Sequence, residues 1–145
     1  MEALVKDKLI IGALENCSLP DLSINKLQIR VDTGAQTSSL HVDDIIQEES
    51  DGKVGVSFSI HPDIYDVEKT IRCWAPIVDV RSIKSSNGES EERFVIRTRI
   101  VLGTVDKNIE VTLTDRSEMS YRMLFGRQGM GNDFLVDPAQ TFLHP

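Results

Sequence analysis

The sequence predicts an all-β fold, and three observations support this prediction. Apolar and polar side chains alternate over several short segments, which is the period-2 pattern of strands with one buried face. Turn-forming stretches separate these segments at spacings typical of sheets built from hairpins. The sequence contains no amphipathic helix longer than about two turns; the best short candidates are residues 43–47 and 126–131.

The first legible strand covers residues 26–31, where three apolar side chains alternate with three polar ones until Gly34 breaks the pattern. Residues 53–60 repeat this alternation, and a short apolar run at 77–80 predicts a further strand. The turn-rich stretches between the predicted strands are residues 48–53, 61–66, 85–92 and 104–108.

Two strands of the C-terminal half form a predicted hairpin. In residues 93–102, four apolar side chains share one face and three arginines share the other, as a strand with one solvated face requires. Residues 108–115 again carry apolar side chains at alternate positions. We expect this second strand to return antiparallel to the first through residues 103–108.

Length and charge limit the possible functions. The 145 residues are the size of one ordinary domain, and we expect a single domain over residues 1–145. The net charge is −7, so nucleic acid is not an expected partner. No apolar run approaches the roughly 20 residues that span a membrane. The N-terminus lacks the pattern of a signal peptide, which predicts a cytoplasmic protein; an exported precursor trimmed of its signal would look the same.

Neither a metal nor a cofactor is predicted. Cys17 and Cys73 lie far apart and match no metal or redox spacing, so we expect free thiols. The three histidines, His41, His61 and His144, are isolated from one another, and no His-Glu-x-x-His helix occurs. The sequence also has no glycine-rich loop of the kind that binds nucleotide phosphates.

One motif suggests chemistry. Asp32-Thr33-Gly34 follows the strand at 26–31 directly, although such a tripeptide alone is more often a turn than a catalytic site. A second element, Met123-Leu124-Phe125-Gly126, is by itself only a buried strand that ends in a tight turn. Together, on either side of a β-rich region, the two elements resemble the paired signature of retropepsin-like aspartic peptidases.

The resemblance extends over nearly the whole chain, from Ile11 to Pro138. The sequence is similar to the bacterial retropepsin-like family that is often labelled ATP-dependent zinc protease. This resemblance implies a retropepsin-like closed β-barrel with a hairpin flap and at most short helices. Neither half of that label follows from the residues, for the reasons given above. The segments that carry the resemblance are VDTGAQTSSLHV, VRSIKSSNGESEERFVIRTRIVLG, IEVTLTDRSEMSYRMLFGRQGM and FLVDP.

The resemblance assigns roles to the motif residues. Asp32 would be the catalytic carboxylate, one of a pair that shares a proton and activates water by general acid–base catalysis. Thr33 would contribute a buried hydroxyl that braces two such loops, and Gly34 would let the backbone approach the carboxylates. Ala35 would face the substrate, and Arg127 would anchor loops. Residues 37–39 either line the site or cap a turn, and we favour the turn.

The flap implied by the resemblance covers residues 76–98, and an ordinary exposed hairpin is the alternative. Its tip includes Ser85, Ser86 and Gly88, which would contact the substrate, and the Asn-Gly dipeptide there favours a type I′ turn.

Arginines near the flap suggest the substrate's charge. Arg81, Arg97 and Arg99 would attract acidic chains, and for Arg93 a solvated strand face is preferred. The competing interpretation for the whole row is a solvated face.

Two functions are compatible with the sequence: an aspartic-type peptidase or amidase, and a non-catalytic module that binds an acidic or peptide-like ligand. The family resembles partners of ATP-grasp glutamate ligases, which implies glutamate-rich or modified peptides as substrates. Because only one Asp-Thr-Gly occurs, we expect a homodimer that pairs two copies of Asp32. The apolar segments 134–137 and 141–143 either join that interface or complete the chain's own sheet. An extra hairpin around residues 53–74 would, alternatively, block the dimer.

Overall fold

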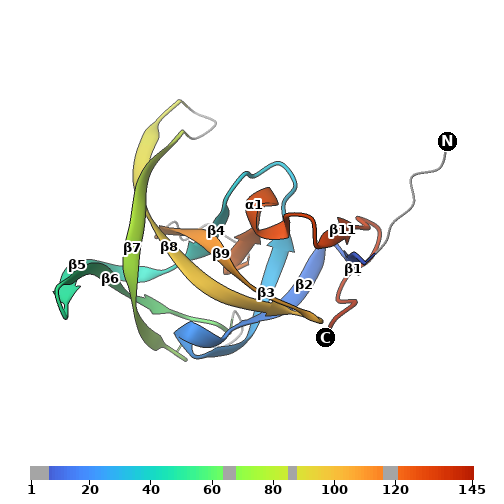
Figure 1. Cartoon of the computed structure of the whole chain (residues 1–145), viewed down its shortest axis with the longest axis horizontal. Coiled ribbons are helices and arrows are strands. Elements are labelled where there is room, and N and C mark those ends of the chain that lie inside the picture. The colour runs from blue at the N-terminus through green and yellow to red at the C-terminus, as the bar shows by residue number, and fades with distance from the viewer. Residues whose placement is uncertain (1–6, 64–67, 85–87, 116–120) are drawn as a thin grey trace.

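A computed structural model describes residues 7–63, 68–84, 88–115 and 121–145. The described residues are mostly strands, with one short α-helix and one 3-10 turn, as the all-β prediction requires (Figure 1). The elements are β1 (Leu9–Ile11), β2 (Leu14–Leu19), η1 (Pro20–Leu22), β3 (Ile24–Val31), β4 (Ser38–His41), β5 (Asp43–Ser50), β6 (Lys53–Ile60), β7 (Ile71–Lys84), β8 (Ser90–Leu102), β9 (Val105–Thr114), β10 (Met123–Phe125), α1 (Arg127–Met130) and β11 (Phe134–Val136).

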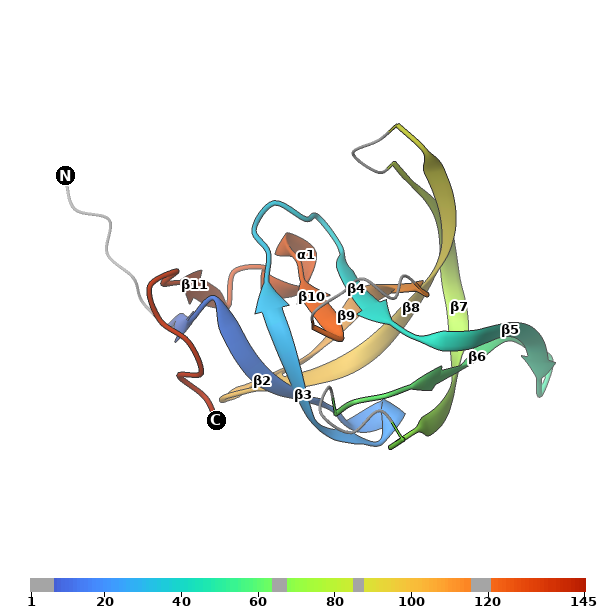
Figure 2. The same cartoon turned by 180° about the vertical axis from the view of Figure 1, so that it is seen from behind.

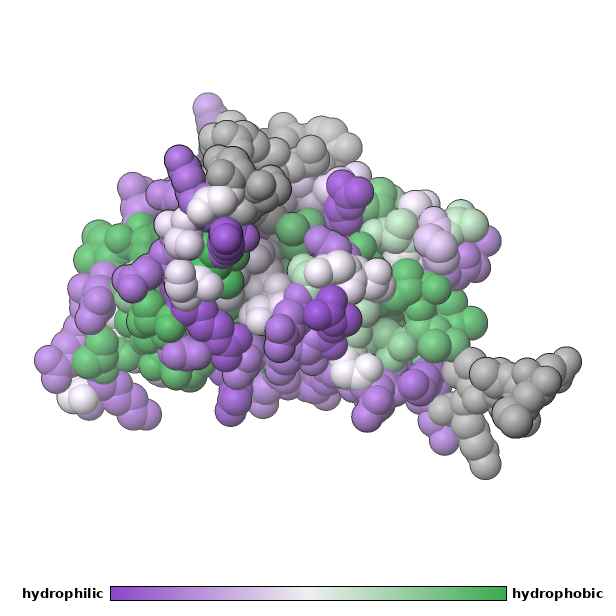
Figure 3. All heavy atoms as spheres, turned by 90° about the horizontal axis from the view of Figure 1, so that it is seen from above, coloured by the Kyte–Doolittle hydropathy of each residue, from purple (hydrophilic) through white to green (hydrophobic). Residues whose placement is uncertain are grey.

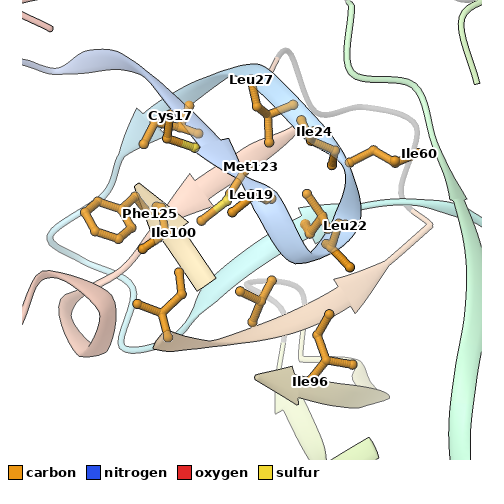
Figure 4. Close-up of a cluster of buried hydrophobic side chains, with 14 of the residues drawn as sticks. Cys17, Leu19, Leu22, Ile24, Leu27, Ile60, Ile96, Ile100, Met123 and Phe125 are labelled. Atoms are coloured by element: carbon orange, nitrogen blue, oxygen red, sulfur yellow. The ribbon is translucent and has the colours of Figure 1, made fainter. Parts of the chain in front are cut away.

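Six strands form a closed barrel in the order β2-β3-β10-β4-β9-β8. The pairing of Ser18 in β2 with Val101 in β8 closes it. Apolar side chains from strands far apart in the sequence, such as Leu19, Ile96 and Phe125, are fully buried in the interior (Figure 4). Burial of the alternate apolar positions therefore holds the barrel together, and the predicted retropepsin-like barrel is confirmed.

A three-stranded extension continues the sheet beyond β8. The first half of β7 pairs with β6 and its second half pairs with β8, and β5 pairs with the outer edge of β6. The pairing register with β8 shifts between Ile77 and Asp79, so Val78 is the extra residue of a bulge. Beyond the bulge, β7 and β8 leave the barrel as a long hairpin (Figures 1 and 2). The run predicted at 77–80 is therefore the middle of a 14-residue strand.

Local predictions had mixed outcomes. The helix candidate at 126–131 is confirmed as α1, but the candidate at 43–47 is wrong because these residues belong to β5, which pairs with β6. Pairing with a neighbouring strand outweighed the weak local preference of this segment. The return predicted over 103–108 is shorter than expected: Gly103, at φ +59°, makes the turn and β9 begins at Val105.

The C-terminal segment is attached to the barrel through a buried carboxylate. Glu15 is fully buried; its Oε2 accepts hydrogen bonds from the backbone N–H groups of Gly12 (2.8 Å) and Leu143 (3.1 Å), and its Oε1 accepts one from His144 (3.1 Å). The predicted apolar segment at 134–137 contains β11, which pairs in parallel with β1 of the same chain.

Candidate active site

Asp32 lies where β3 leaves the barrel. β10 sits between β3 and β4, parallel to β3 and antiparallel to β4. The loop of residues 32–37, which we call the Asp32 loop, therefore starts and ends beside the turn that follows β10 (Figure 2). The backbone N–H of Asp32 donates a hydrogen bond of 2.9 Å to the carbonyl of Phe125. The two motifs, which lie 88 residues apart in the sequence, are thus in direct contact.

The short helix α1 fixes the middle of the Asp32 loop. The backbone N–H groups of Arg127 and Gln128 donate to the carbonyls of Ala35 (2.9 Å) and Gln36 (2.8 Å). The Arg127 guanidinium donates a further hydrogen bond of 2.8 Å to the carbonyl of Thr33. These contacts agree with the loop-anchoring role that the resemblance implies for Arg127.

Gly126 allows the two loops to approach closely. A Cβ atom at this position would lie 2.8 Å from the carbonyl carbon of Thr37 and 3.0 Å from the carbonyl oxygen of Ala35, closer than side chains normally come to backbone. The N–H of Gly126 also donates to the buried Ser38 hydroxyl at 3.0 Å. Of the residues at 37–39, Ser38 therefore holds the glycine turn.

The Asp32 side chain is half-buried and oriented by its own loop. Its Oδ1 accepts a hydrogen bond of 2.9 Å from the N–H of Gly34. Thr33 and Gly34 are exposed in the single chain, so the buried position expected for the Thr33 hydroxyl is not present here. A second protein surface against this loop would be needed to bury it.

A groove of about 750 Å³ lies beside the Asp32 loop. Seen from the side to which the flap and the Asp32 loop point, hydrophilic side chains gather over the middle of the molecule (Figure 3). Three regions form the groove walls: the Asp32 loop with Ser39, the outer part of the β7–β8 hairpin, and β9 with α1. The lining residues are Gly34, Ala35, Gln36, Thr37, Ser39, Arg81, Ser82, Ile83, Lys84, Arg93, Glu110, Thr112 and Gln128.

The charged lining is mainly cationic, although the whole chain is acidic. Among the described residues that line the groove, Arg81, Lys84 and Arg93 are the cations and Glu110 is the single acid. Arg81 of β7 stands directly opposite Arg93 of β8 in the pairing register. Like charges at opposed positions destabilise a sheet, so this pair concentrates positive charge at a local energetic cost.

Arg81 connects the flap hairpin to both other walls. Its guanidinium donates to Asp79 (2.8 Å), to the Thr37 hydroxyl (3.3 Å) and to Glu110 (3.0 Å). The hydrogen bonds to Asp79 and then Glu110 raise the pKa of Arg81, and the bond from Arg81 lowers the pKa of Asp79. Arg81 is therefore a fixed cation that ties the hairpin base to the Asp32 loop.

The other predicted arginines lie outside the groove lining. Arg97 is exposed and approaches Glu110 at 3.8 Å. Arg99 lies further along β8, toward the turn that leads into β9, where its Nε donates to Asp106 at 2.7 Å. The hydrogen bonds to Asp106 raise the pKa of Arg99. We therefore leave Arg99 out of the candidate site.

The flap hairpin exists as β7 and β8, but most of its predicted tip lies outside the described residues. The predictions for Ser85 and Ser86 therefore lie outside the described residues. Gly88 is described and adopts a φ of +89° with open space around it. Its left-handed conformation is the one that a tight glycine turn needs.

Sequence reasoning missed several lining residues. The Arg93 side chain is only 10% exposed and approaches Glu91 at 3.4 Å, so the solvated face preferred for it is wrong. Lys84, Glu110 and Gln128 were not considered. A residue-by-residue alignment of the two hairpin strands would have placed Arg81 opposite Arg93. It would thereby have shown that positive charge is concentrated there.

The barrel and the joined Asp-Thr-Gly and glycine-turn loops define a retropepsin-like domain. Residues 10–145 match the model of the RimB-like family, described as "Retropepsin-like aspartic endopeptidase RimB". The chain belongs to this family.

Relatives with related sequences are longer. Proteins named "Probable alpha-L-glutamate ligase" from Shewanella pealeana and Desulfotalea psychrophila are each 46% identical to the chain, over 136 and 132 residues. The matches cover 94% and 91% of this chain but 30% and 28% of those proteins. The chain thus spans less than a third of the length of these relatives.

A solved structure has the same fold. The crystal structure of Lpg0085 from Legionella pneumophila, a protein described as having unknown function, superposes with a TM-score of 0.77 at 29% identity. The superposition covers 92% of this chain and 96% of that one. Among the residues that the structure describes here, no helix is both long and apolar enough to cross a bilayer.

Proposed function

We propose that this protein is an aspartic-type peptidase that hydrolyses peptide bonds in acidic chains, with Asp32 as the catalytic carboxylate. The observation that carries the proposal is the contact between the Asp32 loop and the Gly126 turn at the edge of a cationic groove. Backbone hydrogen bonds hold Asp32 beside Phe125, and Gly34 orients its Oδ1. Such fixed geometry is what general acid–base chemistry on a bound peptide requires.

The mechanism needs a second carboxylate. One member of the pair takes a proton from water as the water attacks the peptide carbonyl, and the other donates a proton to the carbonyl oxygen. Collapse of the tetrahedral intermediate expels the amine, which takes up a proton, and no covalent enzyme intermediate forms. Two carboxylates in direct contact share one proton, because the repulsion between two negative charges prevents both from being ionised.

A homodimer would supply the pair. The sequence holds one Asp-Thr-Gly, and the exposure of Thr33 and Gly34 leaves the Asp32 loop open to a second copy. A two-fold axis beside the loop would bring Asp32 against Asp32 of the other copy and would bury Thr33. β11 pairs with β1 within the chain, so the proposed contact is built around the Asp32 loop itself.

Acidic peptides are the favoured substrates. Arg81, Lys84 and Arg93 line a groove in a protein whose net charge is −7, and a local cationic cleft concentrates anionic ligands. The relatives' name specifies ligation of alpha-L-glutamate. We propose that this chain hydrolyses glutamate-rich peptide segments and acts on the product of an ATP-grasp ligase of that kind.

Cleavage assays on peptides of matched length test the proposal. We expect the wild type to cleave an oligoglutamate peptide and to leave an oligoglutamine peptide intact, and Asp32→Asn to cleave neither. Asp106→Asn removes the same charge at the far end of the β8–β9 hairpin and should retain full activity. Binding of oligoglutamate without cleavage by the wild type would instead identify a binding module.

Mixing experiments test the shared dyad. An excess of Asp32→Asn added to dilute wild type should suppress cleavage, because mixed dimers hold one intact Asp32, whereas an excess of Asp106→Asn should not. The specific rate should also fall on dilution as dimers dissociate. A rate unaffected by both treatments, in a sample shown to be monomeric, would contradict the dimer.

A further inference from the structure

Glu110 places a carboxylate among the groove cations. It lies on β9, and its side chain is 21% exposed. One oxygen, Oε2, accepts from Arg81 at 3.0 Å, and the other, Oε1, approaches Arg97 at 3.8 Å. Glu110 therefore touches one arginine of the groove wall and one on the adjoining outer face of β8.

The backbone of Glu110 is fixed independently of its carboxylate. Its N–H donates to the side-chain oxygen of Gln128 at 3.1 Å, which ties β9 to α1 and so to the Asp32 loop. Arg81 is held by Asp79 and Thr37 as well as by Glu110. Removal of the Glu110 carboxylate would therefore leave both the strand and the arginine in place.

The carboxylate of Glu110 occupies the position that an acidic ligand needs. A guanidinium binds a carboxylate in a planar, charge-assisted geometry, and two carboxylates at one arginine repel each other. A ligand with one acidic group exchanges one ion pair for another and gains little. A ligand with several adjacent acidic groups also reaches Lys84 and Arg93 and can compensate for displacing Glu110.

We propose that Glu110 is an internal competitor: its carboxylate competes with substrate carboxylates for Arg81 and so sets the selectivity of the groove for runs of acidic residues. This inference rests on the proposed acidic-peptide function. Glu110 pairs with Arg81 in the structure, and a substrate carboxylate displaces it. Glu110 is a specificity-determining residue and takes no part in proton transfer at Asp32.

Binding measured without cleavage tests the inference. In the Asp32→Asn background, Glu110→Gln keeps the shape of the side chain and removes its charge. We expect hexaglutamate to bind this variant roughly three- to tenfold more tightly by calorimetry, on the usual scale of a partly exposed charged pair. A hexapeptide with a single glutamate among glutamines should gain more than hexaglutamate does, so the preference for acidic runs should narrow. Glu110→Ala should change affinity in the same direction.

Two controls separate local displacement from net charge. Asp106→Asn makes the same change in charge on the same hairpin and should alter hexaglutamate affinity by less than about twofold. Adding Arg81→Gln should abolish the gain from Glu110→Gln, because the competed arginine is then absent. Equal gains from Asp106→Asn and Glu110→Gln would overturn the inference, as would unchanged or weaker hexaglutamate binding by Glu110→Gln.

The outcomes also separate the inference from the proposed function. Tighter binding by Glu110→Gln, with no cleavage by any active-site-intact chain, would support the competitor and reject the peptidase. If the wild type cleaves oligoglutamate, and Glu110→Gln changes neither the cleavage rate nor the affinity for hexaglutamate, the peptidase is supported and the competitor is rejected. Failure of hexaglutamate to bind any variant would reject the acidic groove and the competitor together.

Discussion

Replacing Glu15 with glutamine should release the C-terminal segment from the barrel. In the native chain the buried carboxylate accepts three backbone N–H groups, from Gly12, Leu143 and His144. Glutamine offers one carbonyl oxygen and turns an NH₂ group toward the remaining donors. The bond to Gly12 can persist because that residue is buried and held, while the amides of Leu143 and His144 turn to water.

The expected loss follows from these bonds. A hydrogen bond to a charged group contributes about 1.5–3 kcal/mol, and the two released donors are solvated in the freed segment, which places each loss at the low end of that range. We therefore expect Glu15→Gln to lower the free energy of unfolding by about 3–4 kcal/mol. Urea unfolding followed by the fluorescence of Trp74, the sole tryptophan, measures this. Hydrogen exchange should show loss of protection at Leu143 and His144.

Two further variants test whether Glu15 holds the C-terminal segment. Glu49→Gln, on the exposed part of β5, removes the same charge and should change stability by less than about 0.5 kcal/mol. Deleting residues 143–145 removes two of the three donors, so Glu15→Gln should then cost only about 1 kcal/mol. A full-length loss below about 1 kcal/mol, or the same loss in the truncated chain, would show that Glu15 does not hold the segment.

Three further predictions concern the site and its surroundings. Gly126→Ala should destabilise the fold by about 1–3 kcal/mol, because its Cβ meets backbone of the Asp32 loop, and should abolish cleavage; denaturant unfolding and the peptide assay check both. Burial raises the pKa of Cys17 to about 12, so its thiol should resist alkylation at pH 8.5 until the protein unfolds, and the less enclosed Cys73 should react first. The contribution of the protonated Cys17 thiol to folding stability is full below about pH 9 and is lost as the pH rises toward 12. If a carboxylate pair activates water, EDTA and ATP should leave the cleavage rate unchanged, and a rate abolished by EDTA and restored by zinc would contradict the aspartic mechanism.

The strands could be predicted because their signals are local, and the paired loops because of the family resemblance. Alternation in residues 26–31 and 53–60 reports burial of one face directly, and both segments are strands in the structure. The contact between Asp32 and Phe125 was implied by two short motifs whose pairing is a property of the family. Each motif alone would have been an ordinary turn.

The composition of the groove could not be predicted, because it depends on strand register. The bulge at Val78 decides which side chains of the outer hairpin face the Asp32 loop, and a one-residue shift would send Arg81 to the opposite face. Arg93 and Arg99 share a face of β8 in the sequence pattern, yet one lines the groove and the other pairs with Asp106. Position along the strand, and not periodicity, separates them.

The two halves of the site are held by different kinds of bond, and their proposed roles follow from this. Backbone hydrogen bonds with Phe125 and α1 fix the Asp32 loop. Side-chain ion pairs hold Arg81, with Asp79 and Glu110 as its partners. These partly exposed pairs are weak and exchangeable, so a ligand carboxylate can replace a protein carboxylate without moving the Asp32 loop. Under the proposed function, chemistry would reside on the Asp32 loop and recognition on the ion-paired side chains. Changes at Glu110 should therefore alter affinity, while changes at Gly126 should alter catalysis.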